Sequence, residues 1–368
     1  MGWRYIAQRV PSGEFVDFDL PLKDVSIART LSGPGRLSAT IPVEVTRLRG
    51  PDGRPVLDPW GTAIWAENEG QIRGGGIYVA PSMRGEAWSL DCMGISGYPQ
   101  AMAWTADPYA GVDVDPLDLV RRIWSHLQSQ PGGALGVVVD STTSPVRVGT
   151  PDRDVSFTTS AGQDVGFTAG PVRLDWWSTH DLGKVIDDHA ASTPFDYLED
   201  TAWDGEHLVH RLRLGYPTLG TRRHDLRFAI GENIHLIPDL SAAEGDYATE
   251  VLGLGAGEGR TTVRTPTLTR PAMGLRRVAV HIDKSARTTA ALLPAARAAL
   301  AAADGALGLR QVVINDHTHA PLGSFDVGDE IRVTGPTGWV DLDAWVRVVE
   351  IEIRPTESDR MTATVVEV

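Results

Sequence analysis

The chain has 368 residues, of which 42% are hydrophobic, so it is long enough to form two or three domains with buried cores. Its formal net charge is −14 without any block of basic residues, which argues against tight binding to nucleic-acid phosphates. The only cysteine, Cys92, excludes an intrachain disulfide and a Cys-based metal site. The sequence shows neither an apolar run near the roughly 18 residues of a membrane span nor the apolar core of a signal peptide at its start.

Residues 1–105 predict an N-terminal β-barrel domain. Short segments alternate apolar and polar residues and are separated by turns, as is typical of strands in a small barrel or sandwich. The predicted strands are 25–31, 36–43, 63–67, 71–79 and 88–92. The second hairpin carries a glycine bulge at 74–76. Cys92 falls on the same strand face as Trp88 and Leu90, which favours a buried core thiol.

Residues 106–227 predict a middle section that combines helices and strands. Asp115 and Pro116 supply an N-cap and a first-turn proline for a helix that continues to residue 127. A second helix is expected over 181–190. A hairpin follows, with strands at 195–200 and 207–217. The glycine- and threonine-rich stretch 132–170 is interpreted as loops with weak strands.

A run of alternating glycines, Gly253, Gly255, Gly257 and Gly259, follows a strand predicted over 248–254. A phosphate-binding glycine loop has to open a helix, whose N-terminus supplies the N–H groups. Here β-branched residues and a proline follow instead, so no nucleotide cofactor is expected. Alternating glycines remove the side chains from one face of a strand, which lets another backbone approach. We therefore predict a close-packing loop or a subunit interface at these four glycines.

The last section, 263–368, predicts a helix followed by a C-terminal β-barrel domain. The alanine-rich segment 288–303 has helical spacing and contains Pro294, so the helix is expected to start near this proline or to kink there. Strands follow within 324–333, 345–353 and 361–368. Strands within 228–262, including one at 234–237, are expected to complete the N-terminal barrel. The predicted fold class is α+β, mainly β, with two small barrels or sandwiches flanking an α/β middle section.

Two histidines are the best metal candidates in the sequence. His317 and His319 would lie on one face of an extended segment, with Asp316 on the other. A zinc site needs a third ligand and an open position, and no such ligand is nearby in the sequence. A polar loop or strand end is the favoured interpretation, and no metal site is predicted. His207 and His210 would point to opposite faces of their strand.

Carbohydrate chemistry is the other hypothesis considered. Trp176 and Trp177 suggest a sugar platform, and Asp187 and Asp188 a carboxylate pair. Adjacent residues on a helix point about 100° apart, so these two carboxylates cannot flank one glycosidic bond. The eleven tryptophans are scattered along the chain, which favours cores and subunit interfaces over one cleft. The sequence contains no Gly-x-Ser-x-Gly elbow, His-Glu-x-x-His motif or Walker loop, so no catalytic residue is assigned and no enzyme is predicted.

The order of these elements resembles the tail hub, or minor tail protein, of long-tailed (siphovirus-type) bacteriophages, which is related in fold to phage baseplate hubs. The resemblance covers most of the chain, and it depends on the order of the segments rather than on any single motif. The segments that carry it are 64–79, 88–94, 214–220, 231–234, 248–251 with the glycine run, and 327–331.

The resemblance implies a homotrimer in which two similar barrels per subunit form a pseudo-sixfold ring at the virion tail tip. It implies as partners the tail tube or distal tail protein, the tape-measure protein, and other tail-tip or receptor-binding proteins. DNA would pass through the channel without specific binding, which suits the acidic charge. The alternatives are a tail-associated cell-wall carbohydrate-binding or carbohydrate-degrading protein, and a β-rich adhesin without a channel.

Overall fold

A computed structural model describes most of the chain. The described residues are 2–84, 87–158, 164–241, 247–257, 260, 262–271, 275–283, 286, 288–303, 308–338, 340–355 and 360–368. The chain divides into two compact units, each formed from segments that are distant in sequence. The first comprises 1–150, 171–238 and 311–368, and the second comprises 151–170 and 239–310. The three consecutive domains predicted from the sequence remain a prediction about parts that fold independently.

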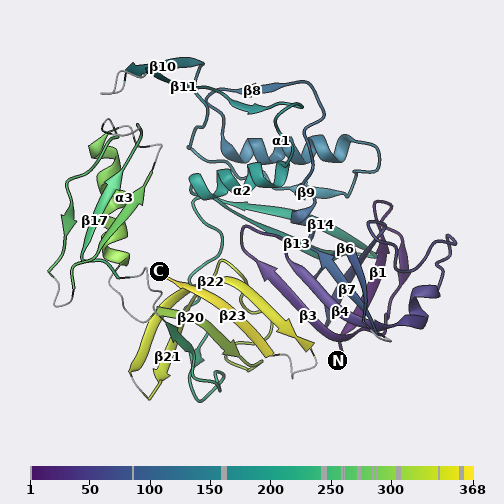
Figure 1. Cartoon of the computed structure of the whole chain (residues 1–368). Helices are drawn as coiled ribbons and strands as arrows, with labels where there is room; N and C mark the ends of the chain where they lie inside the picture. The colour runs from purple at the N-terminus through teal and green to yellow at the C-terminus, as the bar shows by residue number, and fades with distance from the viewer. Residues whose placement is uncertain are drawn as a thin grey trace. The chain divides into compact units, whose positions relative to one another are not determined.

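The first unit is built mainly from strands (Figure 1). Its strands are β1 (Arg4–Arg9), β2 (Phe15–Asp17), β3 (Lys23–Thr30), β4 (Arg36–Pro42), β5 (Thr62–Asn68), β6 (Gln71–Arg84), β7 (Ala87–Met93), β8 (Tyr109–Gly111), β9 (Val137–Val139), β12 (Val172–Leu174), β13 (Asp196–Asp204), β14 (His207–Gly215), β15 (Phe228–Ala229), β20 (Gly308–Ile314, from Gln311 onward), β21 (Glu330–Pro336), β22 (Asp341–Arg354) and β23 (Arg360–Glu367). Its helices are α1 (Pro116–Ser129), α2 (Leu182–Ser192) and the short 3₁₀ helices η1 (Val43–Arg47) and η2 (Ile95–Gly97).

One sheet connects the N-terminal strands with the C-terminal ones. Its strands follow the order β20–β23–β22–β3–β4–β7–β6–β5–β1–β2, and β21 pairs with β22. The junction is the antiparallel pairing of β3 with β22, in which Ile27 lies opposite Ile353 and Thr30 opposite Glu350. Both hairpins predicted in the first 105 residues are confirmed, as are the strand at 88–92 and the burial of Cys92.

The glycine bulge predicted in the second hairpin is also present. Ala66 pairs with Gly74 and Glu67 with Ile72, so Arg73 is the extra residue on β6. A Cβ on Gly75, whose φ is +147°, would lie 2.2 Å from the carbonyl oxygen of Ile64. Glycine is therefore required here by both backbone conformation and space.

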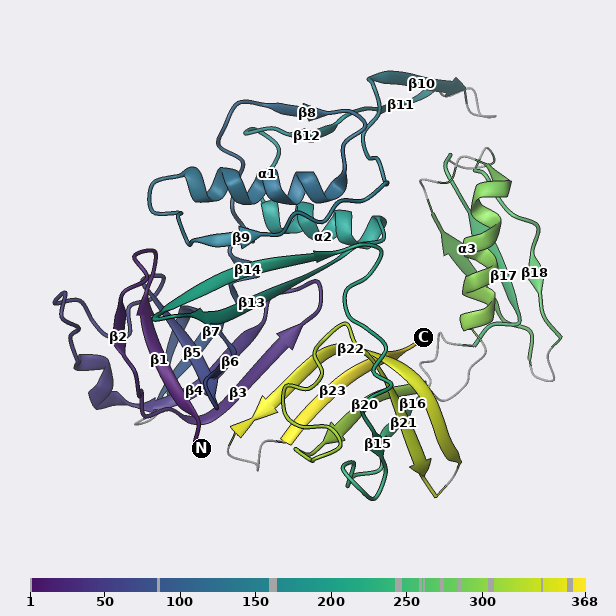
Figure 2. The ribbon, with the colours of Figure 1, turned by 180° about the vertical axis from the view of Figure 1, so that it is seen from behind.

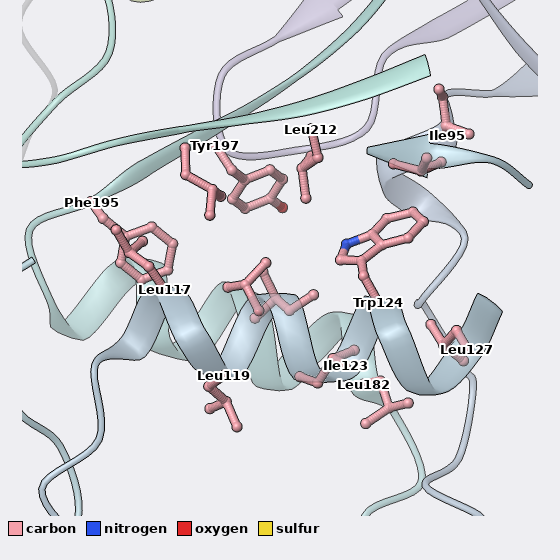
Figure 3. Packing of buried hydrophobic residues seen from close by; sticks show 14 of the residues in the cluster. Ile95, Leu117, Leu119, Ile123, Trp124, Leu127, Leu182, Phe195, Tyr197 and Leu212 are labelled. Atoms are coloured by element: carbon pink, nitrogen blue, oxygen red, sulfur yellow. The ribbon is translucent and has the colours of Figure 1, made fainter. Parts of the chain in front are cut away.

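Two helices cover a small sheet in the middle of the first unit. β13 pairs with β14 along their whole length, β9 runs parallel to β14, and α1 and α2 lie side by side across this sheet (Figures 1 and 2). Figure 3 shows Leu117 and Trp124 of α1 facing Tyr197 and Leu212, which project from the strands. All four are at most 3% exposed, so this is a true core.

The second unit contains one longer helix and a small sheet. Its elements are β10 (Arg153–Thr158), β11 (Asp164–Ala169), β16 (Asp239–Ser241), β17 (Glu250–Leu254), β18 (Leu268–Thr269), β19 (Val278–Ile282) and α3 (Thr289–Ala302). β18, β17 and β19 form a sheet in that order, with β19 parallel to β17, and α3 packs on one face (Figure 2).

Three expectations from the sequence are corrected by the structure. Among the strands within 228–262, β15 pairs with β21, one of the C-terminal strands, rather than with a strand of the first 105 residues, and β17 pairs with β18 and β19. The predicted strand at 234–237 is wrong, because Asn233 turns the chain by accepting a hydrogen bond from the Ala229 N–H. The helix does not start at Pro294: it begins at Thr289 and contains the proline, because the Thr288 hydroxyl caps the N–H of Ala291 at 3.2 Å. The kink at Pro294, the other alternative, stays a prediction. Short strands β9, β10 and β11 lie within the stretch interpreted as loops.

Candidate functional site

An open apolar face of the small sheet is the clearest candidate for a binding surface in the second unit. Val280 lies opposite Leu252 and Ile282 opposite Leu254, so these side chains share one face of the sheet. On β19, Val278, Val280 and Ile282 are 44%, 51% and 60% exposed. We call Leu252, Leu254, Val278, Val280 and Ile282 the open face. A contiguous exposed apolar patch of this kind is a candidate contact surface.

The other face of the same sheet is closed by α3. Val251 and Gly253 point toward the helix, where Leu292 and Ala296 are fully buried. A Cβ on Gly253 would lie 3.1 Å from both of those helix side chains and 2.9 Å from the Thr265 methyl. The glycine is therefore closely packed against a helix of its own chain.

The rest of the glycine run forms a tight loop. The N–H of Gly255 donates to the carbonyl of Val263 at 2.6 Å, and a Cβ on Gly255 would lie 2.4 Å from the carbonyl oxygen of Ala286. Gly257 has a φ of +104°, and Gly259 lies outside the described residues. The described residues 262–271 contain no α-helix of the kind that follows a phosphate-binding loop. The subunit-interface role of these glycines remains a prediction.

The candidate carbohydrate residues lie on separate features. Trp176 and Trp177 are 59% and 54% exposed and meet edge to face, with ring centroids 5.1 Å apart. Asp187 accepts a hydrogen bond from the Tyr197 hydroxyl at 2.6 Å, whereas Asp188 pairs with Lys184 at 2.9 Å. The two carboxylates thus have different partners, as expected for adjacent helix positions.

The other tryptophans are spread over cores and surface. Trp65, Trp104 and Trp124 are buried, and Trp60 is 59% exposed.

Beside α1, a groove of about 820 Å³ is lined by residues that include Trp104 and Arg122. The Arg122 guanidinium lies 4.1 Å from the ring centroid of Tyr109, within the range of a cation–π contact.

His207 and His210 lie in different environments, as predicted. His207 is exposed, whereas His210 is 8% exposed and stacks on Trp65 with ring centroids 4.9 Å apart. Burial lowers the pKa of His210 to about 4, so this histidine is neutral at physiological pH. Burial also raises the pKa of the Cys92 thiol, which makes it unreactive.

A third potential metal-binding residue, absent from the sequence around His317 and His319, lies beside them in the structure. Glu232 lies beside His317 and His319, with one potential ligand atom from each residue within 4.8 Å of the others. Sequence reasoning missed it because 85 residues separate Glu232 from His317. Hydrophobic periodicity carries no signal for such a contact.

None of the helices in the described ranges is long and apolar enough to cross a lipid bilayer. No protein-family profile matches the sequence, and no curated protein matches it.

Solved structures of tail proteins share its fold. The 43 kDa tail protein of prophage MuSo2 from Shewanella oneidensis has a TM-score of 0.61 at 9% identity, covering 99% of this chain and 98% of its own. A tail protein from Neisseria meningitidis MC58 has a TM-score of 0.59 at 13% identity, covering 99% of this chain and 96% of its own. Prophage tail protein gp18 from Listeria monocytogenes EGD-e has a TM-score of 0.54 at 12% identity, covering 98% of this chain and 94% of its own. The fold is thus that of phage tail proteins and is mainly β, as the resemblance implied.

Proposed function

We propose that this chain is a structural protein of a phage tail, and that it acts as the hub joining the tail tube to the distal tip. The observation that carries the proposal is the extent of the fold similarity, which covers 99% of this chain and 98% of the Shewanella tail protein. A match over the full length of both chains concerns the whole architecture of a tail protein, rather than one module that recurs in unrelated proteins.

The proposed assembly is a homotrimer whose subunit contacts are heterologous and close after three copies. Two strand groups, joined through β3 and β22, would supply the two similar barrels that each subunit contributes to a pseudo-sixfold ring. The open face of β17 and β19 is the surface we assign to a neighbouring copy. Because α3 already covers Gly253, a neighbour would reach the sheet from the side of Val280 and Ile282.

The channel of this ring would conduct DNA without holding it. A net charge of −14 per chain repels phosphates, so DNA passing through such a ring would not be retained. The tail tube or distal tail protein, the tape-measure protein and other tip proteins are the proposed partners. No chemical step is needed in this role.

Oligomeric state tests the proposal. Mass photometry of the purified chain is expected to show a species of three times 39.7 kDa, and cryo-electron microscopy a threefold ring with a central channel. Ile282→Asp and Val280→Asp place a charge on the open face and are expected to dissociate the trimer. Val138→Asp is the matched control, since Val138 is a 56% exposed valine on β9 in the other unit. A monomer at micromolar concentration and in the virion would contradict the hub.

A cell-wall carbohydrate-binding role is the second candidate, and the exposed pair Trp176 and Trp177 is the observation that favours it. Exposed tryptophan faces can stack on sugar rings. Co-sedimentation with purified cell-wall polysaccharide, lost in Trp176→Ala and retained in Trp60→Ala, would support this role. If the protein forms a trimer and binds no polysaccharide, only the hub role is supported. Release of soluble fragments would indicate hydrolysis.

A further inference from the structure

The cluster of Glu232, His317 and His319 brings together two segments of the first unit. Glu232 lies at the tip of the turn that follows β15, and the two histidines lie in the connection between β20 and β21. The two imidazole rings have centroids 5.0 Å apart, and one carboxylate oxygen and two ring nitrogens lie within 4.8 Å of one another. All three side chains are accessible, and His319 is half exposed.

The backbone holds these two segments together independently of the cluster. The N–H of Asn315 donates to the carbonyl of Asn233 at 2.9 Å, and the N–H of Arg227 donates to the carbonyl of His319 at 3.2 Å. Asn233 is 1% exposed, and its side chain bonds to the backbone of Ala229 and Arg227. The backbone segments that carry the three residues are therefore held together by a buried frame.

The free donor atoms can be identified from the contacts. Nδ1 of His317 accepts the backbone N–H of His319 at 3.2 Å, which orients the ring and leaves its Nε2 available. Glu232 contacts Nδ1 of His319 through Oε1 and pairs with Arg227 through Oε2 at 3.1 Å. An oriented imidazole, a second imidazole and an anchored carboxylate form the donor set typical of three-ligand zinc sites.

We propose that Glu232, His317 and His319 form a binding site for a divalent transition-metal ion of the zinc class. Two imidazole nitrogens select such an ion over Mg²⁺ and Ca²⁺, which prefer oxygen ligands. Bonds of about 2.1 Å bring tetrahedral ligand atoms to about 3.4 Å from one another, which exposed side chains reach by small rotations. The ion would insert between Glu232 and His319, and a water molecule or a donor from another protein would occupy the fourth position.

Bound metal would cross-link the turn after β15 to the connection before β21. This property is independent of trimer formation, since all three ligands belong to one compact unit of one chain.

The test is isothermal titration calorimetry of tag-free, chelator-treated full-length protein with ZnCl₂, followed by Co²⁺ absorption spectroscopy. One ion per chain is expected, with the intense visible bands of four-coordinate cobalt. Glu232→Gln, His317→Gln and His319→Gln are each expected to weaken binding by at least about 10-fold. His235→Gln is the matched control, because His235 is exposed, lies three residues from Glu232 and is outside the cluster.

Far-UV circular dichroism and thermal unfolding of each variant without metal show whether the fold is intact. Equal zinc affinity in wild type and in the His317→Gln/His319→Gln double variant would overturn the proposal. Saturable binding that is lost equally in His235→Gln would overturn it too, since it would place the ion elsewhere.

Discussion

The carboxylate of Glu199 on β13 accepts a hydrogen bond from the backbone N–H of Ser96 in η2, at 2.6 Å. Its other oxygen accepts the N–H of Gly35, in the turn between β3 and β4, at 2.9 Å. A Cβ on Gly35 or Gly94 would lie within 2.4 Å of this carboxylate, so both glycines are needed for its approach. One side chain thus joins the N-terminal strands to the α/β section.

Glu199→Gln tests this junction. The amide keeps one acceptor oxygen and replaces the other with an N–H₂ group, which cannot accept from Ser96 and Gly35 together. The expected loss is about 1–3 kcal/mol in the free energy of unfolding, measured by urea denaturation at neutral pH. Glu206→Gln is the control, because Glu206 is exposed in the turn between β13 and β14. Equal stability of the two variants would show that the junction contributes nothing.

The penalty of Glu199→Gln is also expected to depend on pH. Burial raises the pKa of Glu199, against the hydrogen bonds from Ser96 and Gly35 and the charge of Arg29, which lower it. When the pKa of a carboxyl is higher in the folded state than in the unfolded state, where it is about 4.3, the group stabilises the fold fully at pH values below the unfolded-state pKa. This stabilisation is lost as the pH rises through the folded-state pKa. The penalty should therefore be larger at acidic pH than at neutral pH. A penalty that grows with pH would mean that the ionised form is the preferred one.

The contribution of His210 to stability is expected to depend on pH in the opposite way. Its pKa falls to about 4 because it is buried, where it stacks on Trp65 and contacts the Thr201 hydroxyl at 3.0 Å. When the pKa of a histidine is lower in the folded state than in the unfolded state, where it is about 6.5, the neutral side chain contributes fully to stability at pH values above the unfolded-state pKa. This contribution is lost as the pH falls toward the folded-state pKa. Wild type should lose up to about 3 kcal/mol over this range through His210. His210→Asn should remove that part of the acid sensitivity.

The control for His210 lies on the same strand. His207→Asn makes the same substitution at an exposed histidine of β14, so comparing the two variants separates the effect of the buried site from the effect of the substitution itself. Urea denaturation of the three proteins at several pH values measures the slopes directly. If His210→Asn is as acid-sensitive as wild type, protonation of other groups is responsible.

Two helix caps allow a matched comparison. Asp115 is buried and accepts from the N–H of Leu117 at 2.9 Å and from both the N–H and the hydroxyl of Ser144. Among the hydrogen bonds of the described residues, the Asp181 carboxylate accepts only from the N–H of Lys184, at 2.9 Å. Asp115→Ala should cost about 2 kcal/mol and Asp181→Ala about 1 kcal/mol or less, measured by chemical denaturation. Equal costs would show that the Ser144 contacts add nothing to the cap.

Local patterns in the sequence were sufficient to predict the helices and strands, but not to predict which strands pair with one another. The Asp115 cap, the glycine bulge and the major hairpins follow from residues that are adjacent in the chain. The pairing of Thr30 with Glu350 spans 320 residues, and alternation specifies only which face is buried, not which strand lies beside it. Strand partners at that separation are set by packing of the whole unit.

The candidate sites differ in the same way. The glycine run was detected because its spacing is local, although its packing partner α3 begins 36 residues after Gly253. Glu232 was missed because its turn meets the histidines only through contacts between residues distant in sequence, such as the hydrogen bond from the Asn315 N–H to the Asn233 carbonyl. The open face was not anticipated either, since an alternating strand does not show which of its faces a helix will cover.

Gly253 provides the sharpest test of packing in the second unit. Gly253→Ala places a methyl group 3.1 Å from both Leu292 and Ala296, closer than ordinary carbon contacts, so α3 has to move away. The expected cost is about 1–3 kcal/mol, measured by chemical denaturation. In a double-mutant cycle with Ala296→Gly, which removes the facing methyl, the combined loss should be smaller than the sum of the single losses. Leu252→Ala, on the open face of the same strand, is the control that should show no coupling to Ala296. Additive losses for Gly253→Ala and Ala296→Gly would mean that the methyl is accommodated without displacing the helix, and that the glycine has another purpose.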